Sequence, residues 1–490
     1  MRLAVVVHVI GVLVRLFGPM FVLPALVAAF YHEWRDAVAF ALTAVGSSGL
    51  GHVMRFAGGT AAADAAERLR RVEGMTIVAG SWMLIAHLVA LPYVWAGVGF
   101  IDALFESMSG LTTTGATIFT DFSAYGRGIF FWRSMTQWVG GMGVIALFVA
   151  VLPRLAIGGR ELFFAEAPGP TDEKLTPQIR QTALGLWRLY AALTAVQVLA
   201  LWLAGMSLFD AACHSMTTLA AGGFSPHPSS IAGYQSPAVE WIISFFMFVA
   251  GANFALQYRL VRGNVRAFLD DEEIRAYAGV VVAASVVLAF FLTSSGMQLG
   301  DAVRHAIFQT ASIITTTGYA SVDFNLWSDQ ARVVLLGLMF IGGCAGSAAG
   351  GPKVVRHVLM ARFTFLELRR TLHPRAILPI KLGGRVVPES VMREVVVFML
   401  FYILAFAVGA AIVIALGANL VTGISASATT LGNVGPGFDT IGPMGSFAHL
   451  HPVSKIVLTL EMWIGRLEVL TVLVLVRWEI WQSARWRLAD

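Results

Sequence analysis

The sequence contains little charge. Only 13% of its 490 residues are Asp, Glu, Lys or Arg, whereas 57% are hydrophobic and the mean hydropathy is +0.74. Soluble domains carry about 25% charged residues, so this composition excludes a soluble multidomain enzyme and indicates a polytopic helical membrane protein. The net charge of +5 does not indicate nucleic-acid binding, because the basic residues lie in loops between apolar runs.

Cysteine is scarce as well. Cys213 and Cys344 lie far apart, and neither has neighbours at metal-ligand spacing. We therefore expect neither a disulfide nor a structural metal site. A cleavable signal peptide is not expected either, because the first apolar run is too long for one and contains Arg15, Pro19 and Pro24. We interpret this run as a retained, bent membrane helix.

One short pattern occurs four times, at residues 107–117, 215–225, 310–320 and 424–434. Each copy places a glycine at the same offset after small and hydroxyl-bearing residues, and each lies between two long apolar runs. The four glycines are 108, 95 and 114 residues apart. They are Gly115, Gly223, Gly318 and Gly432.

The segment before each glycine is too short to span a membrane. It covers about 12 residues, and a helix needs about 20 to cross the hydrocarbon core. The irregular backbone that follows is tolerated at membrane depth only where protein buries it or a water path runs beside it. Four half-helices that point their C-terminal ends at one axis would favour a cation there, and the turns would offer rings of carbonyls to it. A single copy would be an ordinary polar turn, but four in register favour an ion pore made by one chain.

These features predict an all-α polytopic membrane protein. Four pseudo-symmetric repeats, each a span, a pore helix and a second span, surround one ion pore, and two extra spans precede them, giving ten spans and four half-spans. The predicted boundaries are 1–73 for two N-terminal helices and a basic loop, 74–157 for repeat one, 158–263 for a cytoplasmic loop and repeat two, 264–360 for repeat three, and 361–490 for a cytoplasmic loop, repeat four and the C-terminal tail.

The basic residues predict the orientation. Of the 34 Lys and Arg residues, 25 fall on one side of the predicted topology, and the positive-inside rule makes that side cytoplasmic. The glycine turns then open to the outside. The longest cytoplasmic segments, 154–180 and 359–393, offer the most surface to a soluble partner.

Aspartates follow three of the glycines, namely Asp121, Asp323 and Asp439. Carboxylates at an outer mouth would raise the local cation concentration. Capping of the loops is an equally good reading of each residue. Repeat two has residues 225–228 (Ser-Pro-His-Pro) at this place, so any acidic ring is incomplete.

Two features lie on the cytoplasmic half of the predicted pore. The glycine-rich run 342–352 interrupts the second span of repeat three, and each glycine weakens a helix by about 1 kcal/mol relative to alanine. We expect a flexible intramembrane loop there, with close helix packing as the alternative. Arg466 lies in the last apolar run, where a charge normally faces a water path or the bundle interior. Pairing with Glu461 or Glu468 is the competing interpretation.

Four further stretches are distinctive: 137–143 (Gln-Trp-Val-Gly-Gly-Met-Gly), 165–177 (beginning Ala-Glu-Ala-Pro-Gly-Pro-Thr), 373–376 (His-Pro-Arg-Ala) and 431–437 (Leu-Gly-Asn-Val-Gly-Pro-Gly). With the four repeats, they resemble the TrkH branch of the TrkH/KtrB/HKT potassium-transporter superfamily over essentially the whole chain. The two extra N-terminal spans and the 165–177 stretch favour the TrkH branch over KtrB.

This resemblance implies a transporter rather than an enzyme, placed in the bacterial cytoplasmic (inner) membrane. Each chain would hold one K⁺-selective pore and no organic cofactor, two chains would form a homodimer, and a cytosolic ring of nucleotide-binding RCK subunits (TrkA-type) would regulate it. The implied filter consists of the two residues before each glycine and the glycine itself. These residues are Thr113, Thr114, Gly115, Ala221, Gly222, Gly223, Thr316, Thr317, Gly318, Thr430, Leu431 and Gly432.

The resemblance also implies a gate. The family's intramembrane gating loop matches 342–351, and its pore arginine matches Arg466. The implied gate residues are Gly342, Gly343, Gly346, Gly350, Gly351 and Arg466. The departures are small: alanines at 220 and 221 replace the frequent hydroxyl residues, and Ala348 stands where the loop commonly has Ser or Thr. In the plant HKT branch serine at the first glycine position accompanies sodium transport, so Gly115 favours potassium.

Other classes of protein remain as alternatives. A secondary transporter would bind its substrate between broken helices of inverted repeats, whereas all four units here share one topology. Proton- or sodium-coupled K⁺ symport on the same fold stays open. A purely structural membrane scaffold does not account for four glycine turns in register.

Overall fold

The computed structural model describes residues 1–59, 69–151, 178–373, 379–467, 472, 481 and 482. These residues are predominantly helical, and the predicted all-α membrane fold is confirmed. Within the described ranges the strands are confined to one short antiparallel hairpin, β1 (Lys381–Leu382) and β2 (Arg385–Val386). The 165–177 stretch, most of 154–180 and residues 374–376 of the His-Pro-Arg-Ala stretch lie outside the described residues.

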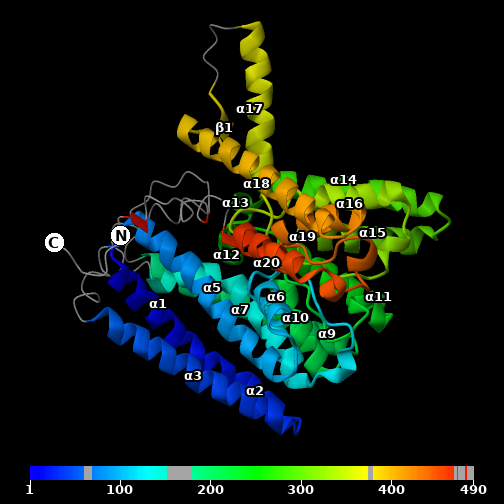
Figure 1. Ribbon diagram of the computed structural model, residues 1–490. Coiled ribbons are helices and arrows are strands. Elements are labelled where there is room, and N and C mark those ends of the chain that lie inside the picture. The colour runs from blue at the N-terminus through cyan, green and yellow to red at the C-terminus, as the bar shows by residue number, and fades with distance from the viewer. Residues whose placement is uncertain (60–68, 152–177, 374–378, 468–471, 473–480, 483–490) are drawn as a thin grey trace.

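The N-terminal helices pack side by side. The first span consists of α1 (Leu3–Phe17), the 3-10 turn η1 (Gly18–Phe21) and α2 (Val22–Phe30), and α3 (Trp34–Gly58) runs along it (Figure 1). The predicted irregularity of the first span lies at η1, which contains Pro19. Glycines explain the close approach, because a Cβ on Gly11 or Gly51 would overlap the backbone of the opposite helix.

Four repeats of a long helix, a short pore helix and a second helical segment follow. Repeat one comprises α5 (Arg71–Trp95), the pore helix α6 (Phe100–Leu111), η3 (Phe122–Ala124) and α7 (Arg127–Val151). Repeat two comprises α9 (Gln178–Leu203), the pore helix α10 (Leu208–Leu219), η5 (Ser230–Tyr234), α11 (Pro237–Ala250) and α12 (Phe254–Val261), with α13 (Val265–Leu269) after it.

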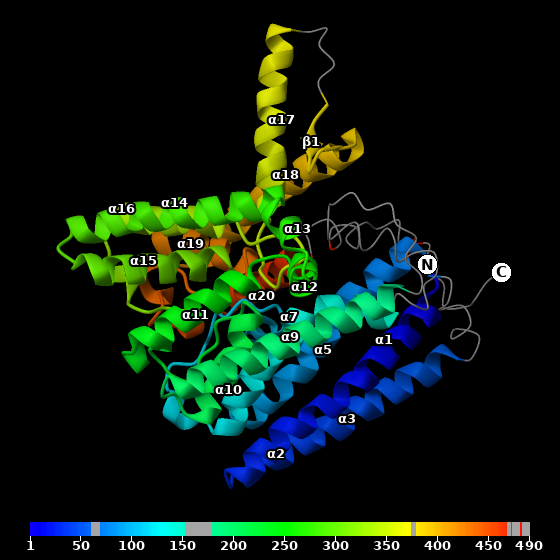
Figure 2. The same ribbon diagram turned by 180° about the vertical axis from the view of Figure 1, so that it is seen from behind.

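Repeats three and four keep the same order. Repeat three comprises α14 (Glu272–Ser294), the pore helix α15 (Leu299–Ile314), η6 (Phe324–Leu326), α16 (Asp329–Met339) and α17 (Val354–Leu372). Repeat four comprises α18 (Glu389–Ala415), the pore helix α19 (Leu420–Leu431), η7 (Asp439–Ile441), η8 (Phe447–His449) and α20 (Pro452–Leu467). Figure 2 shows the other side of the molecule, where α9, α10 and α11 lie near one another.

The second helical segments of repeats two and three are broken. The predicted interruption in repeat three is confirmed, because residues 340–353 separate α16 from α17. A break in repeat two was not predicted: α11 and α12 meet at an angle of 104°. By length and composition, six described helices can cross a membrane, or seven with this bent pair. Ten membrane spans were predicted, but within the described ranges the second spans of repeats two and three are broken helices.

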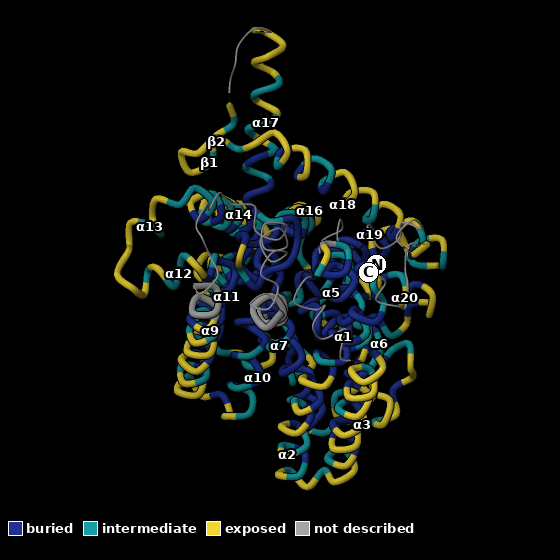
Figure 3. Tube along the Cα trace, turned by 90° about the vertical axis from the view of Figure 1, so that its left-hand side faces the viewer, coloured by how far each residue is buried: buried dark blue, intermediate teal, exposed yellow. Residues whose placement is uncertain are grey.

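Burial is distributed as expected for a protein surrounded by lipid. The buried residues lie at the centre, and long helices such as α3, α9 and α18 turn exposed residues outward (Figure 3). Many of these exposed residues are large and apolar, among them Val45, Leu203 and Leu400. Helix α17 projects from the body of the molecule (Figures 1 and 2). The pore helices are thus enclosed by the longer helices.

Candidate ion pore

All four pore helices end in the same way. After the C-cap comes a non-glycine residue in the left-handed region, and the N–H of the next residue is hydrogen-bonded to the carbonyl five residues back, as in a Schellman motif. The four bonds are Thr114 N to Ser109 O (2.9 Å), Gly222 N to Thr217 O (2.8 Å), Thr317 N to Ser312 O (2.9 Å) and Val434 N to Thr429 O (2.8 Å). The left-handed residues are Thr113 (φ 55°), Ala221 (54°), Thr316 (58°) and Asn433 (53°). Each helix is therefore closed off while the chain turns into irregular backbone.

A left-handed glycine stands two residues further on in every repeat. These glycines are Gly115 (φ 81°), Gly223 (75°), Gly318 (78°) and Gly435 (109°). We call residues 113–115, 221–223, 316–318 and 433–435 the turn segments. The first three coincide with the predicted filter residues.

The predicted register of repeat four is wrong. Gly432 is the C-cap of α19, with φ −78° in the right-handed region, so it corresponds to Thr112 rather than to Gly115. Thr430 and Leu431 belong to α19 itself. The sequence contains two glycines three residues apart, 432 and 435, and the pattern was aligned on the first of them.

A second set of glycines supports the corrected register. A turn glycine precedes each pore helix, and the left-handed glycine follows it after 18 residues, or after 22 in repeat three, whose pore helix is longer. The turn glycines are Gly97 (φ 96°), Gly205 (99°), Gly296 (94°) and Gly417 (104°). Gly435, but not Gly432, keeps the spacing of 18 from Gly417.

The four turn segments form a closed ring. A Cβ on each left-handed glycine would overlap the carbonyl oxygen of the middle residue in the next repeat, and the overlaps run from repeat one through four and back to one. The pairs are Gly115 with Gly222 O, Gly223 with Thr317 O, Gly318 with Val434 O, and Gly435 with Thr114 O. Side chains are therefore excluded at these positions by both φ and space. The result is a ring of backbone carbonyls at the centre of the molecule.

Polar side chains stabilise the turn segments of repeats one, three and four. The Oγ1 atoms of Thr112 and Thr114 lie 2.7 Å apart, and those of Thr315 and Thr317 lie 2.8 Å apart. Asn433 Nδ2 donates to Thr114 Oγ1 at 2.9 Å, which joins repeat four to repeat one. Asn433 was absent from the predicted site because of the register error.

A buried ion pair supports the pore helix of repeat one. Arg133 of α7 and Glu106 of α6 are both almost fully buried, with Nε and Oε1 2.7 Å apart. Glu106 also accepts the N–H of Ile118 (2.9 Å), and the Arg133 guanidinium lies 4.1 Å from the centroid of the Phe224 ring. Because both groups are buried, substitution of either one would leave the other as a buried charge without its partner.

The 340–353 loop lies against the ring. Gly350 N donates to Thr316 Oγ1 at 2.6 Å, directly at turn segment three. The loop also bonds to the break in repeat two: Cys344 N donates to Gly251 O (2.9 Å), and Gly346 O accepts from Phe254 N (3.0 Å). The two broken segments thus satisfy each other's backbone, which explains a break that the local sequence around 251–253 did not reveal.

A carboxylate holds the other side of the loop. Glu273 of α14 accepts the N–H groups of Ala345 (2.7 Å) and Val355 (3.1 Å). Within the loop Gly342, Gly346 and Gly351 have positive φ, between 71° and 81°. The glycines therefore provide both the irregular backbone and the close packing that were weighed as alternatives.

Arg466 contacts the loop and α7. Its Nη1 donates to Ala348 O at 2.9 Å and its Nη2 to Gly140 O at 3.2 Å. Glu461 instead accepts hydrogen bonds from Ser427 (2.7 Å) and Thr430 (2.8 Å) of the pore helix α19. Glu468 lies outside the described residues. The structure thus places the guanidinium between the loop and α7.

The aspartates after the glycines cap their loops. Asp121 accepts from Ser123 N, Asp323 from Asn325 N, and Asp439 from Asn419 and Thr422. The hydrogen bonds from Asn419 and Thr422 lower the pKa of Asp439. The capping interpretation describes all three, and it leaves their charge at the loop surface.

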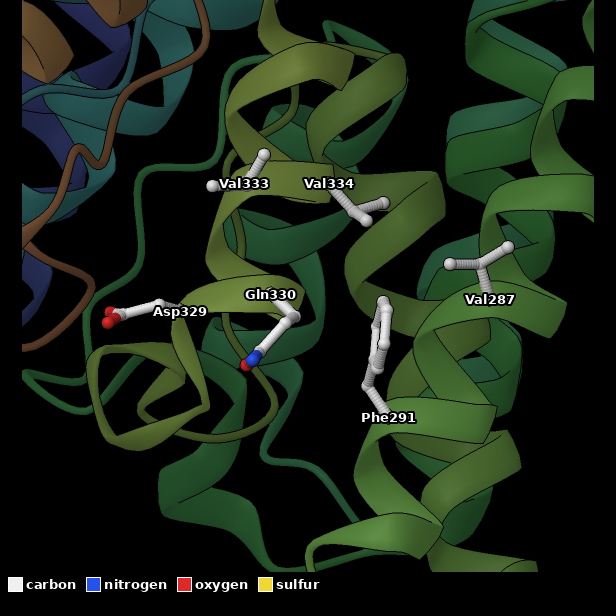
Figure 4. Close-up of a pocket in the computed structure, with 6 residues that line it drawn as sticks. All are labelled: Val287, Phe291, Asp329, Gln330, Val333 and Val334. Carbon is white, nitrogen blue, oxygen red and sulfur yellow. The ribbon is translucent and has the colours of Figure 1, made fainter.

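A hollow of about 530 Å³ lies apart from the ring, between α14 and α16. Figure 4 shows that apolar side chains, including Val287, Phe291 and Val334, line it, with Asp329 and Gln330 at one end. None of its lining residues belongs to a turn segment or to the loop. Within the described ranges, no group of three or more His, Cys, Asp and Glu residues is placed to hold a metal ion.

These features define a class of protein: a multi-pass membrane transporter with one four-repeat pore. A TrkH family profile, described as "Cation transport protein", matches residues 55–488. The chain belongs to this TrkH family of cation transport proteins, and it is a transporter rather than an enzyme.

Similar proteins cover its full length. The Trk system potassium uptake protein TrkH of Escherichia coli strain K12 is 38% identical over 99% of this chain and 100% of its own. TrkG of the same strain is 35% identical over 98% of this chain and 99% of its own. The crystal structure of the potassium transporter TrkH from Vibrio parahaemolyticus matches with a TM-score of 0.87 and 36% identity, covering 98% of this chain and all of that one.

Proposed function

We propose that this chain is the K⁺-selective, ion-translocating subunit of an uptake system in the bacterial cytoplasmic membrane, with its turn segments facing outside. The observation that carries the proposal is the closed ring of turn segments 113–115, 221–223, 316–318 and 433–435. Rings of backbone carbonyls select ions by replacing their hydration shells. The names of the curated relatives, potassium uptake proteins, support K⁺ as the transported ion.

Expression in a cell deficient in K⁺ uptake tests this function. We expect growth on low K⁺ and uptake of K⁺ and Rb⁺, whose size is close, in preference to Na⁺. In reconstituted membranes the ratio of K⁺ to Na⁺ permeability should lie well above one. A ratio near one in protein that is correctly inserted would refute the proposal.

The 340–353 loop and Arg466 form the proposed gate below this filter. The loop contacts turn segment three through Gly350 and is held by Glu273 and Arg466. A positive charge at this place raises the barrier for a cation that leaves the filter. Opening would require the loop to exchange these contacts for others.

Ion-coupled symport is the second candidate, and one residue favours keeping it. Glu461 is buried in the wall of repeat four and hydrogen-bonded to hydroxyls of the pore helix α19. Ionisable groups inside the membrane are typical of proton relays. Reversal potentials separate the two candidates, since a symporter departs from the K⁺ equilibrium potential when the gradient of the second ion changes, whereas a channel does not.

Two protein partners complete the proposal. Helix α17, which projects from the molecule, exposes Phe365, Leu368 and Leu372, and such a surface suits a second copy in a homodimer. The second partner is a cytosolic, nucleotide-binding ring of RCK-type (TrkA-like) subunits, which would act on segments 154–180 and 359–393. Cross-linking between copies through α17 and co-purification of a nucleotide-binding ring test the two partners. Full nucleotide-responsive gating by the purified chain alone would contradict the second.

A further inference from the structure

The second turn segment, residues 221–223, has no polar side chain that could stabilise its backbone. The middle residue of the other three segments is Thr114, Thr317 or Val434, but in repeat two it is Gly222. The preceding C-cap is also reduced, to Ala220. Segment two therefore has neither the hydroxyl pair of segments one and three nor a side chain behind its middle carbonyl.

Gln137 of α7 occupies the space that this missing side chain would fill. Its Nε2 donates to Gly222 O at 2.6 Å, and its Oε1 accepts from Phe224 N at 3.0 Å. The side chain is fully buried. A Cβ on Gly222 would overlap the Gln137 amide. The amide is therefore hydrogen-bonded to the backbone on both sides of Gly223.

The same contact reaches the junction between repeats one and two. Gly222 O is the carbonyl against which Gly115 packs in the ring. Gln137 Nε2 lies 3.8 Å from the position of a Cβ on Gly115. One amide from repeat one thus fixes the orientation of a ring carbonyl in repeat two and the space beside the glycine of repeat one.

We infer that Gln137 is a positioning residue for ion selectivity. From α7 it provides the side chain that the middle residue of the turn segment provides in the other three repeats. This inference rests on the proposed function of the ring as a K⁺ filter. The competing explanation is that Gln137 only fills a buried space. A space-filling role predicts that any side chain of similar volume preserves selectivity, and it predicts no special relationship between positions 137 and 222.

The test is a double-mutant cycle with selectivity as its readout. In reconstituted full-length protein, Gln137→Leu keeps most of the volume but removes both hydrogen bonds, and we expect the ratio of K⁺ to Na⁺ permeability to fall about tenfold. Gly222→Thr alone should be equally damaging, because the threonine overlaps the amide. Gln137→Ala combined with Gly222→Thr should recover most of the wild-type ratio, since the side chain now comes from position 222.

The control variant is Gln197→Leu. Gln197 is also fully buried, and its amide atoms have no hydrogen-bond partner among the described residues, so the permeability ratio should stay at the wild-type value. A wild-type ratio near one would refute the proposed filter itself. If the wild type is selective, either of two results would overturn the inference. One is an unchanged permeability ratio in Gln137→Leu, and the other is the same low ratio in Gly222→Thr alone and in Gly222→Thr combined with Gln137→Ala. Failure of the double variant to insert would count against it too, because that variant is predicted to fold.

Discussion

The turn segments and the 340–353 loop are both irregular backbone among the described helices, and they are stabilised in different ways. Each turn segment is anchored by the end of its own pore helix, through bonds that span five residues and recur in all four repeats. The loop occurs once, and besides a few local bonds it is held by residues of distant elements: Gly251, Glu273, Thr316 and Arg466.

We propose that this difference separates a fixed region, the turn segments, from a movable one, the loop. Local bonds within a capping motif persist as long as the helix does, and each left-handed glycine is packed against a neighbouring carbonyl. The long-range contacts of the loop are of two kinds: the side chains of Glu273, Thr316 and Arg466 bind its backbone. Backbone bonds join it to the break at 251–253. These contacts come from several separate elements rather than from the end of one helix. Irregular backbone with local anchors is suited to a filter, and irregular backbone with exchangeable anchors is suited to a gate.

The largest expected effect comes from Gly115→Ser in the fixed region. A side chain at φ 81° costs about 1–2 kcal/mol, and it overlaps Gly222 O. We expect the ratio of K⁺ to Na⁺ permeability to fall about tenfold or more. Gly97→Ser is the matched control, because Gly97 has φ 96° with no atom within 4 Å of an added Cβ. An unchanged ratio in Gly115→Ser would remove Gly115 from the filter.

Deletion of residues 344–349, or Arg466→Ala, tests the movable region. A unit charge about 6 Å from the path changes the energy of a monovalent cation by roughly 2–3 kcal/mol at an effective dielectric constant of about 20. We expect basal ion leak to rise about tenfold with the K⁺ to Na⁺ ratio retained. Arg466→Lys, which keeps the charge, should leak less than Arg466→Ala. Unchanged leak in well-inserted protein would favour a packing role, and Arg332→Ala, in a surface ion pair, serves as the control.

Glu273→Gln should loosen the loop without removing a charge from the path. Hydrogen bonds to a charged acceptor contribute about 1.5–3 kcal/mol and neutral ones about 0.5–1.5 kcal/mol. The N–H groups of Ala345 in the loop and of Val355 at the start of α17 are therefore held less firmly. Leak should rise severalfold, less than in Arg466→Ala. The neighbouring Glu272, whose ion pair with Arg362 is partly exposed, provides the control: Glu272→Gln should leave the leak unchanged. Equal leak in both variants would mean that Glu273 does not anchor the loop.

The smallest effect is expected outside both regions, at Asp439. Its pKa is lowered by hydrogen bonds from Asn419 and Thr422. The carboxylate therefore stays ionised to a lower pH than an ordinary aspartate does. Its stabilising contribution is present at neutral pH and is lost only as the pH falls through this lowered pKa. Flux should therefore not change between about pH 7 and pH 5 through this group. Asp439→Asn should reduce flux less than about twofold, and only at low ionic strength; a large loss at high salt would assign Asp439 a direct role.

The fixed region was largely predictable from the sequence. Four short segments with a glycine at one offset indicated the pore helices, and three of the four turn segments were identified by residue. The fourth was misaligned because Gly432 and Gly435 both suit the short pattern, and the backbone dihedral angles distinguish them. The distance of 18 residues from the preceding turn glycine, which repeat four (Gly417) shares with repeats one and two, was the sequence signal that would have corrected it.

The contacts of the movable region were not predictable in the same way. The glycine run indicated an interruption after α16, but not that it pairs with a second break at 251–253. Nor did the sequence indicate that Glu273, 72 residues before Ala345, would hold the loop. Such contacts depend on how separate repeats pack, and no local propensity encodes them. Gln137 is a similar case, since its role depends on the empty space beside Gly222 in another repeat.

One measurement tests the central claim, that a closed ring of four carbonyl turns selects the ion: the ratio of K⁺ to Na⁺ permeability in Gly435→Ala and Gly417→Ala. The two glycines have nearly the same φ, 109° and 104°, so the backbone strain of the substitution is matched. A Cβ at 435 lies 2.7 Å from Thr114 O, whereas one at 417 meets no atom within 4 Å. We predict that Gly435→Ala lowers the ratio about tenfold and that Gly417→Ala leaves it unchanged. Equal ratios in the two variants would contradict the ring.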